Sequence, residues 1–161
     1  MTIKAFTPAL VMLAPLLMAT SCFATGSFYV ANLSPQPLRV EYTQRCEPCV
    51  TPKLIGVAEL RRSRGLSYYA DHLSPAPVEV RGRTDSLLTY SILLPPQFAV
   101  LLFERSVPSG LIGGGKAEPQ RDFAEVTLTA ETSNGRVTYS SANVGEALRR
   151  WHKLIYVIEL P

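Results

Sequence analysis

The two cysteines of Cys46-Glu47-Pro48-Cys49 are the residues of this chain whose type and spacing are best suited to chemistry. Two thiols separated by two residues can cycle between dithiol and disulfide when a following helix lowers the pKa of the first thiol. Pro52 opposes such a helix, and the chain lacks the strand and helix alternation on which that type of redox protein is built. We therefore expect a structural disulfide between Cys46 and Cys49, with a redox pair and a metal site or free thiols as alternatives.

A zinc site would need two ligands besides the cysteines. The sequence offers only His72 and His152 together with carboxylates, and it has no second close pair of ligands. We therefore expect no metal and no cofactor.

A second segment has the glycine and lysine spacing of a phosphate-binding loop. It comprises Gly110, Leu111, Ile112, Gly113, Gly114, Gly115 and Lys116. Ala117 stands where a hydroxyl would hold magnesium, and Pro119 opposes the helix whose N-terminus would face the phosphate. The segment is predicted to be a surface loop, and it is a candidate binding loop because long loops on rigid β-proteins often carry binding function.

The sequence contains no recognisable centre for nucleophilic catalysis. No serine occupies a Gly-x-Ser-x-Gly elbow. Asp71, His72 and Ser74 are close in sequence, but a catalytic triad needs partners that the fold brings together, and neighbouring loop residues rarely meet that geometry. The chain is expected to have no catalytic residues and not to be an enzyme.

The first 24 residues have the layout of a secretory signal peptide. Lys4 is followed by an apolar run over 9–18 and by small residues that end at Ala24. Cleavage after Ala24 leaves a mature chain of residues 25–161. A lipoprotein signal over 1–21, with Cys22 acylated, is the alternative. Either route predicts export to the periplasm, the outer membrane or the medium, and a membrane association only through lipid at Cys22.

Composition is typical of a globular protein, with 47% hydrophobic and 18% charged residues. The formal net charge is +3, and it becomes +2 without Lys4, the only charged residue of the leader. A charge so close to neutral does not indicate a nucleic-acid-binding surface. Protein partners in the envelope or outside the cell fit this balance better.

Short runs rich in Val, Ile, Tyr, Phe and Thr recur after the leader and are separated by Pro, Gly, Asn and Ser. Apolar and polar residues alternate most clearly over 38–43, 78–81 and 124–131, which predicts strands with one buried and one wet face. Asn134-Gly135 lies between two such runs and predicts a hairpin turn. Further strands are expected over 27–33, 53–60, 66–70, 86–94, 98–104, 136–140 and 154–160.

One short helix is expected over 143–151, where Asn143 can cap and Val144, Ala147, Leu148 and Trp151 form an apolar stripe. The fold class is therefore all-β, a single antiparallel β-sandwich of about 7–9 strands with one short C-terminal helix.

The predicted leader and the lack of a recognisable reaction centre favour one class of function over two alternatives. We expect a non-enzymatic, exported protein that binds or assembles with another envelope or extracellular protein. The first alternative is a thiol-redox or metal-handling protein that uses Cys46 and Cys49. The second is a sandwich that binds a small apolar ligand.

Overall fold

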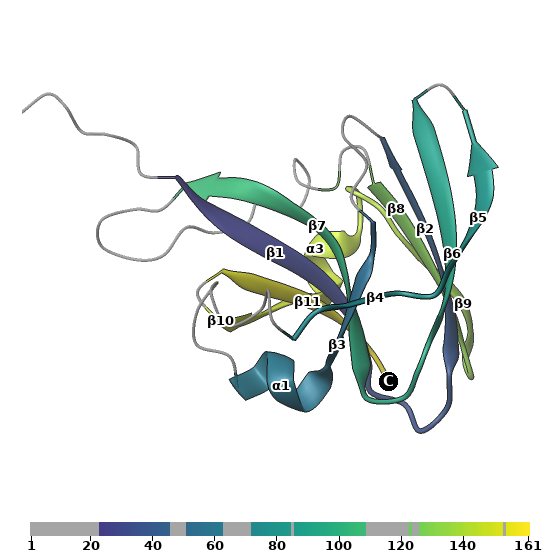
Figure 1. Ribbon diagram of the computed structural model, residues 1–161, viewed down its shortest axis with the longest axis horizontal. Helices are drawn as coiled ribbons and strands as arrows, with labels where there is room; N and C mark the ends of the chain where they lie inside the picture. Colours follow the sequence, from purple (N-terminus) through teal and green to yellow (C-terminus); the bar gives the residue numbers. More distant parts are fainter. Residues whose placement is uncertain are drawn as a thin grey trace, which may run out of the picture.

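A computed structural model describes residues 23–45, 51–62, 72–84, 86–108, 123, 126–152 and 154–161. Within these ranges the chain is mostly β, with eleven strands and two very short helices (Figure 1). The strands are β1 (Phe23–Asn32), β2 (Leu38–Arg45), β3 (Lys53–Gly56), β4 (Ser74–Pro75), β5 (Val78–Arg83), β6 (Leu87–Leu94), β7 (Phe98–Pro108), β8 (Val126–Thr132), β9 (Gly135–Tyr139), β10 (Leu148–His152) and β11 (Ile155–Leu160). The helices are α1 (Val57–Arg62) and α3 (Val144–Ala147).

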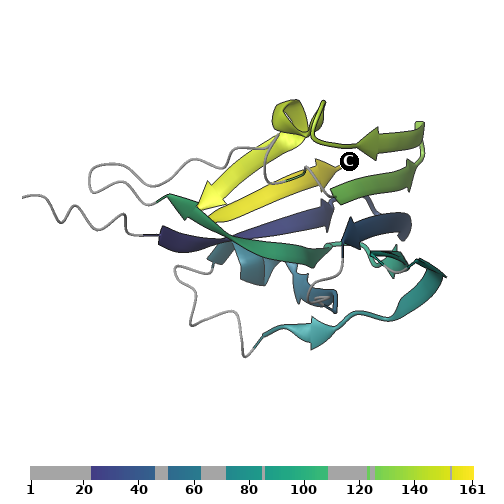
Figure 2. The ribbon, with the colours of Figure 1, turned by 90° about the horizontal axis from the view of Figure 1, so that it is seen from above.

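The strands form two sheets. One has six strands in the order β10-β11-β1-β7-β3-β4, and the other has five antiparallel strands in the order β5-β6-β2-β8-β9. Seen from above, β1 lies between β7 and β11 (Figure 2). The six-stranded sheet is mixed because β1 and β11, the first and last strands of the chain, run parallel. The expected antiparallel arrangement is therefore wrong for this pair, whose adjacency has no local sequence signal.

The two sheets enclose a common hydrophobic core, because side chains from both belong to one buried cluster. The alternation expected over 38–43 is confirmed, since Leu38, Val40 and Tyr42 are buried there. In the opposite sheet Phe28 stacks on Phe103, with ring centroids 4.6 Å apart. Such aromatic pairs add about 0.5–1.5 kcal/mol each beyond the burial of their area.

A second buried cluster lies on the other side of the six-stranded sheet, where α1 packs (Figure 1). Val57 and Leu60 of α1 are buried in it, and Trp151 packs against it. This sheet therefore has side chains buried on both faces.

The hairpin expected at Asn134-Gly135 is confirmed, with Ser133 and Asn134 between the end of β8 and Gly135, the first residue of β9. Thr132 pairs with Gly135, whose φ of 114° is rarely adopted by residues with a side chain. The Thr132 hydroxyl accepts from Asn134 N at 3.3 Å and donates to Gly135 O at 3.0 Å. Glycine is thus required by the turn geometry itself.

The strand expected over 53–60 is only half correct, because it ends at Gly56 and α1 begins at Val57. Val57 N donates to Gln97 O at 2.9 Å, which fixes the point where the chain leaves the sheet. Val57 and Leu60 are three residues apart and therefore face the same side of the helix, towards the second cluster.

The helix expected over 143–151 is also largely wrong. Only Val144–Ala147 is helical, and Leu148–His152 forms β10. Asn143 does not cap the helix with its side chain; it accepts from Ser140 N and donates to Thr138 O, both at 2.8 Å. The apolar stripe is divided, since Ala147 and Leu148 pack on the shared core while Trp151 packs on the second cluster.

Candidate functional site

The residues that the sequence singled out for disulfide bonding, lipidation or loop binding lie outside the described residues. They are Cys22, Cys46, Cys49 and 110–116. The strand ends to which these segments connect are described, and they pair within each sheet. Arg45 ends β2 beside the start of β8, since Gln44 pairs with Val126, and Phe23 of β1 pairs with Pro108 of β7.

The predicted leader overlaps the first strand. β1 begins at Phe23, so cleavage after Ala24 removes its first two residues, whereas cleavage before Cys22 leaves the strand complete. The two pairs affected are those of Phe23 with Pro108 and of Ala24 with Val107.

Neither histidine belongs to a group of potential metal ligands among the described residues. His72 is exposed, and Nε2 of His152, in β10, lies 2.8 Å from Arg61 O, the carbonyl that accepts its hydrogen bond. The described residues contain no group of three or more histidines, cysteines or acidic residues that could hold a metal ion. The described segments also contain no helix that is both long and apolar enough to cross a bilayer.

Asn32 matches the first position of a glycosylation pattern, but it is 0% exposed. Its Nδ2 donates to Gln36 O at 2.8 Å and to Leu94 O at 3.0 Å, and its Oδ1 accepts from Ser34 N at 3.0 Å. The amide therefore holds the connection between β1 and β2 against β6, and it is not available as a glycan acceptor in the folded protein.

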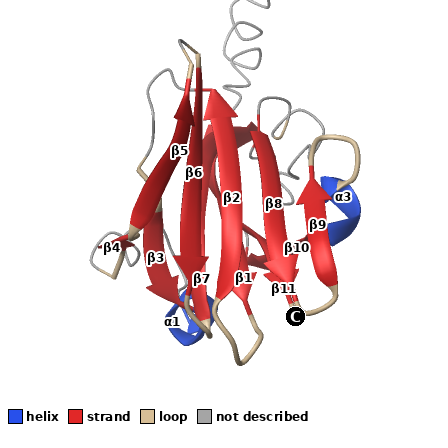
Figure 3. Ribbon diagram, turned by 90° about the vertical axis from the view of Figure 1, so that its right-hand side faces the viewer, coloured by secondary structure: helices blue, strands red, loops and turns tan. Residues whose placement is uncertain are grey.

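The outward face of the five-stranded sheet is a polar surface to which all five strands contribute. Neither helix lies across it (Figure 3). Three cross-strand rows of side chains follow from the register. They are Thr127, Thr43 and Thr89; Thr138, Thr129, Glu41, Ser91 and Glu79; and Arg136, Glu131, Arg39 and Leu93.

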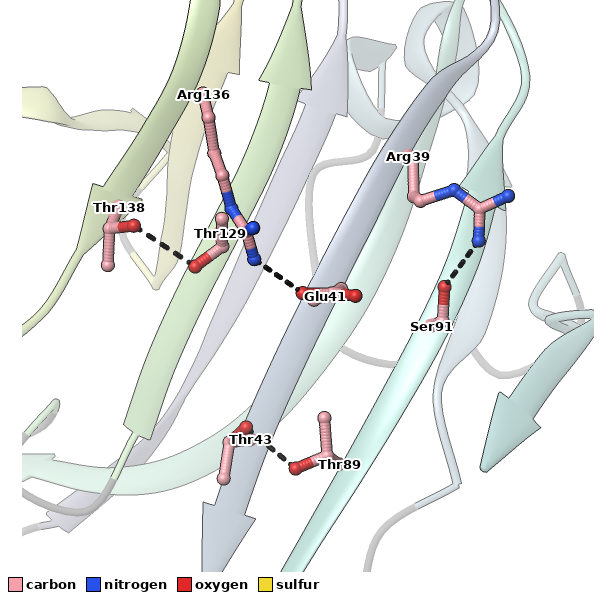
Figure 4. A network of polar contacts seen from close by, with 8 residues as sticks. All are labelled: Arg39, Glu41, Thr43, Thr89, Ser91, Thr129, Arg136 and Thr138. Atoms are coloured by element: carbon pink, nitrogen blue, oxygen red, sulfur yellow. Dashed lines mark hydrogen bonds and ion pairs between the residues drawn. The ribbon is translucent and has the colours of Figure 1, made fainter. Parts of the chain in front are cut away.

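Hydrogen bonds between strands fix these side chains (Figure 4). Thr43 Oγ1 and Thr89 Oγ1 are 2.9 Å apart, and the Thr129 and Thr138 hydroxyls are 3.1 Å apart. Such pairs join β2 to β6 and β8 to β9. They order the surface before any partner arrives.

Charged residues on the same face are paired as well. Arg136 Nη2 reaches across β8 to Glu41 Oε2 at 2.8 Å, and Arg39 Nη1 donates to Ser91 Oγ at 3.1 Å (Figure 4). Because the Arg136 and Glu41 side chains are exposed, this ion pair adds little stability. Its effect is to set the positions of the charges on the face.

The free edges of the five-stranded sheet are shielded against pairing with another strand. On β9, Asn143 Nδ2 donates a hydrogen bond to the backbone carbonyl of Thr138 at 2.8 Å. On β5 the register shifts between Val80 and Gly82, and Arg81 and Arg83 add charge. Bulges and charged residues at an edge oppose the addition of a strand.

The edges of the six-stranded sheet are similarly interrupted. The register between β10 and β11 shifts between Arg150 and His152, and β4 has only two residues, one of which is Pro75. Extended strand addition is therefore disfavoured at this sheet too.

A groove of about 580 Å³ lies beside α1 and the end of β3. It is lined by Leu54, Ile55, Gly56, Val57, Ala58, Glu59, Arg62, His72, Ser74, Gln97 and Phe98. Glu59 Oε2 lies near Gly56, where an added Cβ would be 3.3 Å away. The groove is open, and its lining mixes both charges with apolar residues.

Tyr42 is the described residue whose pKa clearly departs from its ordinary value. Burial, together with the neighbouring Tyr90, raises the pKa of the Tyr42 phenol above 10.0, and Arg105 partly opposes this. The hydroxyl lies 2.8 Å from Gln44 Oε1 and 3.1 Å from Leu102 O. Tyr42 therefore links the two sheets and belongs to the core.

No protein-family model, curated protein or solved structure matches this chain. Its function therefore has to be inferred from its sequence and its geometry.

Proposed function

We propose that this chain is a non-enzymatic, exported β-sandwich protein that binds another envelope or extracellular protein through the outward face of its five-stranded sheet. The observation that carries the proposal is the fixed, uncovered polar face. From β5 to β9 and from Arg39 to Arg45 it extends roughly 19 Å by 20 Å, at the usual strand spacing and rise. Broad, flat surfaces of this kind suit protein partners, whereas small ligands need concave sites.

Two features of the face favour a protein partner over a charged polymer or a membrane. Its rows contain two arginines, Arg39 and Arg136, and three glutamates, Glu41, Glu79 and Glu131, so they carry no excess of basic residues. A nucleic acid or an anionic lipid surface would require an excess of basic residues. The shielded edges direct binding to the side chains of the face and not to the backbone.

Export rests on the leader sequence over residues 1–24 and is part of the same proposal. An exported protein meets other envelope and extracellular proteins and little nucleotide, which agrees with a surface-binding role. The hydroxyl and charged side chains of the face are held by contacts within the chain, so a partner would dock on them with little ordering of side chains.

The proposal is tested by placing a photo-reactive amino acid at Thr129, in the middle of the face, in the full chain expressed in its own host. The matched control carries it at Glu146 of α3, which is exposed and lies off the face. Discrete protein adducts at position 129 and none at 146 are expected. The same adducts at both positions, or none at 129, would contradict the proposal.

A further inference from the structure

A hollow of about 310 Å³ interrupts the otherwise flat face. It is lined by Arg39, Pro77, Val78, Glu79, Ser91 and Leu93, from the first half of β2, the start of β5 and β6. Ser91 lies on the outward side of β6 and yet is only 4% exposed, with Arg39 Nη1 3.1 Å from its hydroxyl. The face therefore combines a flat polar area with one recess.

Leu93 makes one wall of this hollow and is 57% exposed, the largest exposed fraction among the large hydrophobic side chains of the described residues. Its cross-strand partner is Arg39, and the remaining residues of its row, Glu131 and Arg136, are charged. An exposed leucine beside a recess on a polar surface has the anatomy of an interface centre, where an apolar contact is surrounded by a polar rim.

The charged groups at the rim are already engaged within the chain. Glu79 Oε2 lies 2.9 Å from Arg81 Nη2, and Arg39 Nη1 donates to Ser91 Oγ at 3.1 Å. Arg39 also has Glu131 directly opposite on β8. An incoming ion would have to compete with these contacts, whereas a neutral apolar group would leave them in place.

From the proposed function, on which this step rests, we infer that the hollow receives one neutral apolar side chain, aliphatic or aromatic, from the protein partner, and that this anchor packs against Leu93. A volume of about 310 Å³ lies at the lower limit of small-molecule pockets, which run from roughly 300 to 1,000 Å³. It suits a single anchor residue, and such anchors supply much of the binding energy of protein interfaces.

The hollow can be tested without knowing the partner. The probe is N-acetyl-phenylalanine methylamide, compared with N-acetyl-aspartate methylamide. Each is titrated into the folded protein while NMR follows the methyl resonances of Val78, which also lines the hollow and is present in every variant. Saturable shifts with the phenylalanine probe only are expected. Equal binding of both probes, or no saturable shift with either, would overturn the inference.

Substitutions of exposed side chains locate the binding. Leu93→Ser should weaken the phenylalanine probe about ten-fold, the loss expected when an anchor contact of a little over 1 kcal/mol is removed, whereas Leu93→Ile should retain binding. The matched control is Val137→Ser, at a side chain 38% exposed on β9 and away from the hollow. Equal weakening by Leu93→Ser and Val137→Ser would contradict the assignment.

Partner cross-linking separates this inference from the proposed function. In the chain with the photo-reactive residue at Thr129, Leu93→Ser should reduce the adduct about ten-fold if the partner's anchor uses the hollow. An unreduced adduct overturns the role of the hollow and leaves the face as the binding surface. Absence of the adduct from the unsubstituted chain contradicts the proposed function, and the probe titration then decides on the hollow by itself.

Discussion

Removing the Tyr42 hydroxyl tests how the two sheets are joined. The register between β1 and β7 passes from Phe28–Phe103 to Tyr29–Leu101, which leaves Leu102 without a partner in that ladder. Its carbonyl accepts from Tyr42, which belongs to the other sheet, at 3.1 Å. Tyr42→Phe keeps the ring and its packing but leaves this buried carbonyl without its donor.

The expected loss of stability follows from the removal of one hydroxyl donor that two buried acceptors, Leu102 O and Gln44 Oε1, share. A buried polar group left unsatisfied costs about 1–3 kcal/mol, and the retained ring adds no cavity, so we expect a loss of about 2 kcal/mol. With a urea m-value of about 2 kcal/mol/M for a chain of this size, the midpoint should fall by about 1 M.

Tyr90→Phe is the matched control for this measurement. Tyr90 pairs with Tyr42 across β2 and β6, and the two rings stack with centroids 6.4 Å apart. Its substitution should change the free energy of unfolding by less than about 0.5 kcal/mol. Urea unfolding followed by circular dichroism measures both variants. If Tyr42→Phe is no less stable than Tyr90→Phe, the inter-sheet role of the hydroxyl is wrong.

Four further predictions concern stability and the cysteines. Asn32→Ala should lower the free energy of unfolding by about 3 kcal/mol, because Leu94 O loses a buried donor and three partly buried bonds are lost. Ser34→Ala should lower it by less than about 1 kcal/mol, and equal urea midpoints would refute this. Gly135→Ala, at φ 114°, should cost about 1 kcal/mol or more in thermal unfolding, whereas Gly82→Ala, which meets no atom within 4 Å, should cost less; the reverse order would contradict the turn geometry. Because the folded pKa of Tyr42 is raised, its neutral form contributes stability that is complete below the unfolded pKa of about 10 and is lost as the pH rises above that value. Urea unfolding at increasing alkaline pH should therefore show a larger loss of stability for the unsubstituted chain than for Tyr42→Phe. Parallel curves of stability against pH would refute this. If Cys46 and Cys49 form a structural bridge, the intact mass should lack two hydrogens, and replacing both by serine should reduce stability alone; an altered redox activity with unchanged stability would favour the thiol enzyme.

Much of the fold could be predicted from local patterns. The alternation of Leu38, Val40 and Tyr42 with polar residues correctly indicates a strand with one buried face, and Gly135 correctly marks a hairpin. These features depend on neighbours in sequence, where side-chain direction has a period of two and turns demand particular backbone angles.

Features that depend on distant partners could not be predicted in this way. β10 replaces most of the expected helix because Leu148 and Arg150 pair with β11, and β1 accepts β11 as a parallel neighbour. Val57 begins a helix because Gln97 O, forty residues away, accepts its N–H. Tertiary contacts outweigh the weak local preferences of such short segments.

The candidate site shows the same division. The polar sides of β2 and β8 are readable from the alternation of Thr43 and Thr129 with buried neighbours. Their assembly into one face depends on the order β5-β6-β2-β8-β9, which no local pattern specifies. The hollow beside Leu93 is completed by residues of β5, which no local pattern places next to β6. The sequence alone therefore assigned no role to Leu93, a hydrophobic residue on the outward side of β6.

Hydrogen–deuterium exchange on the chain, free and then bound to the partner captured at Thr129, tests the central claim most directly. The outward face is built by β5, β6, β2, β8 and β9, so slower exchange on binding should be concentrated in these strands, with α1 and β10 unchanged. Protection confined to α1 and β10, on the other side of the molecule, would contradict the assignment of the binding surface.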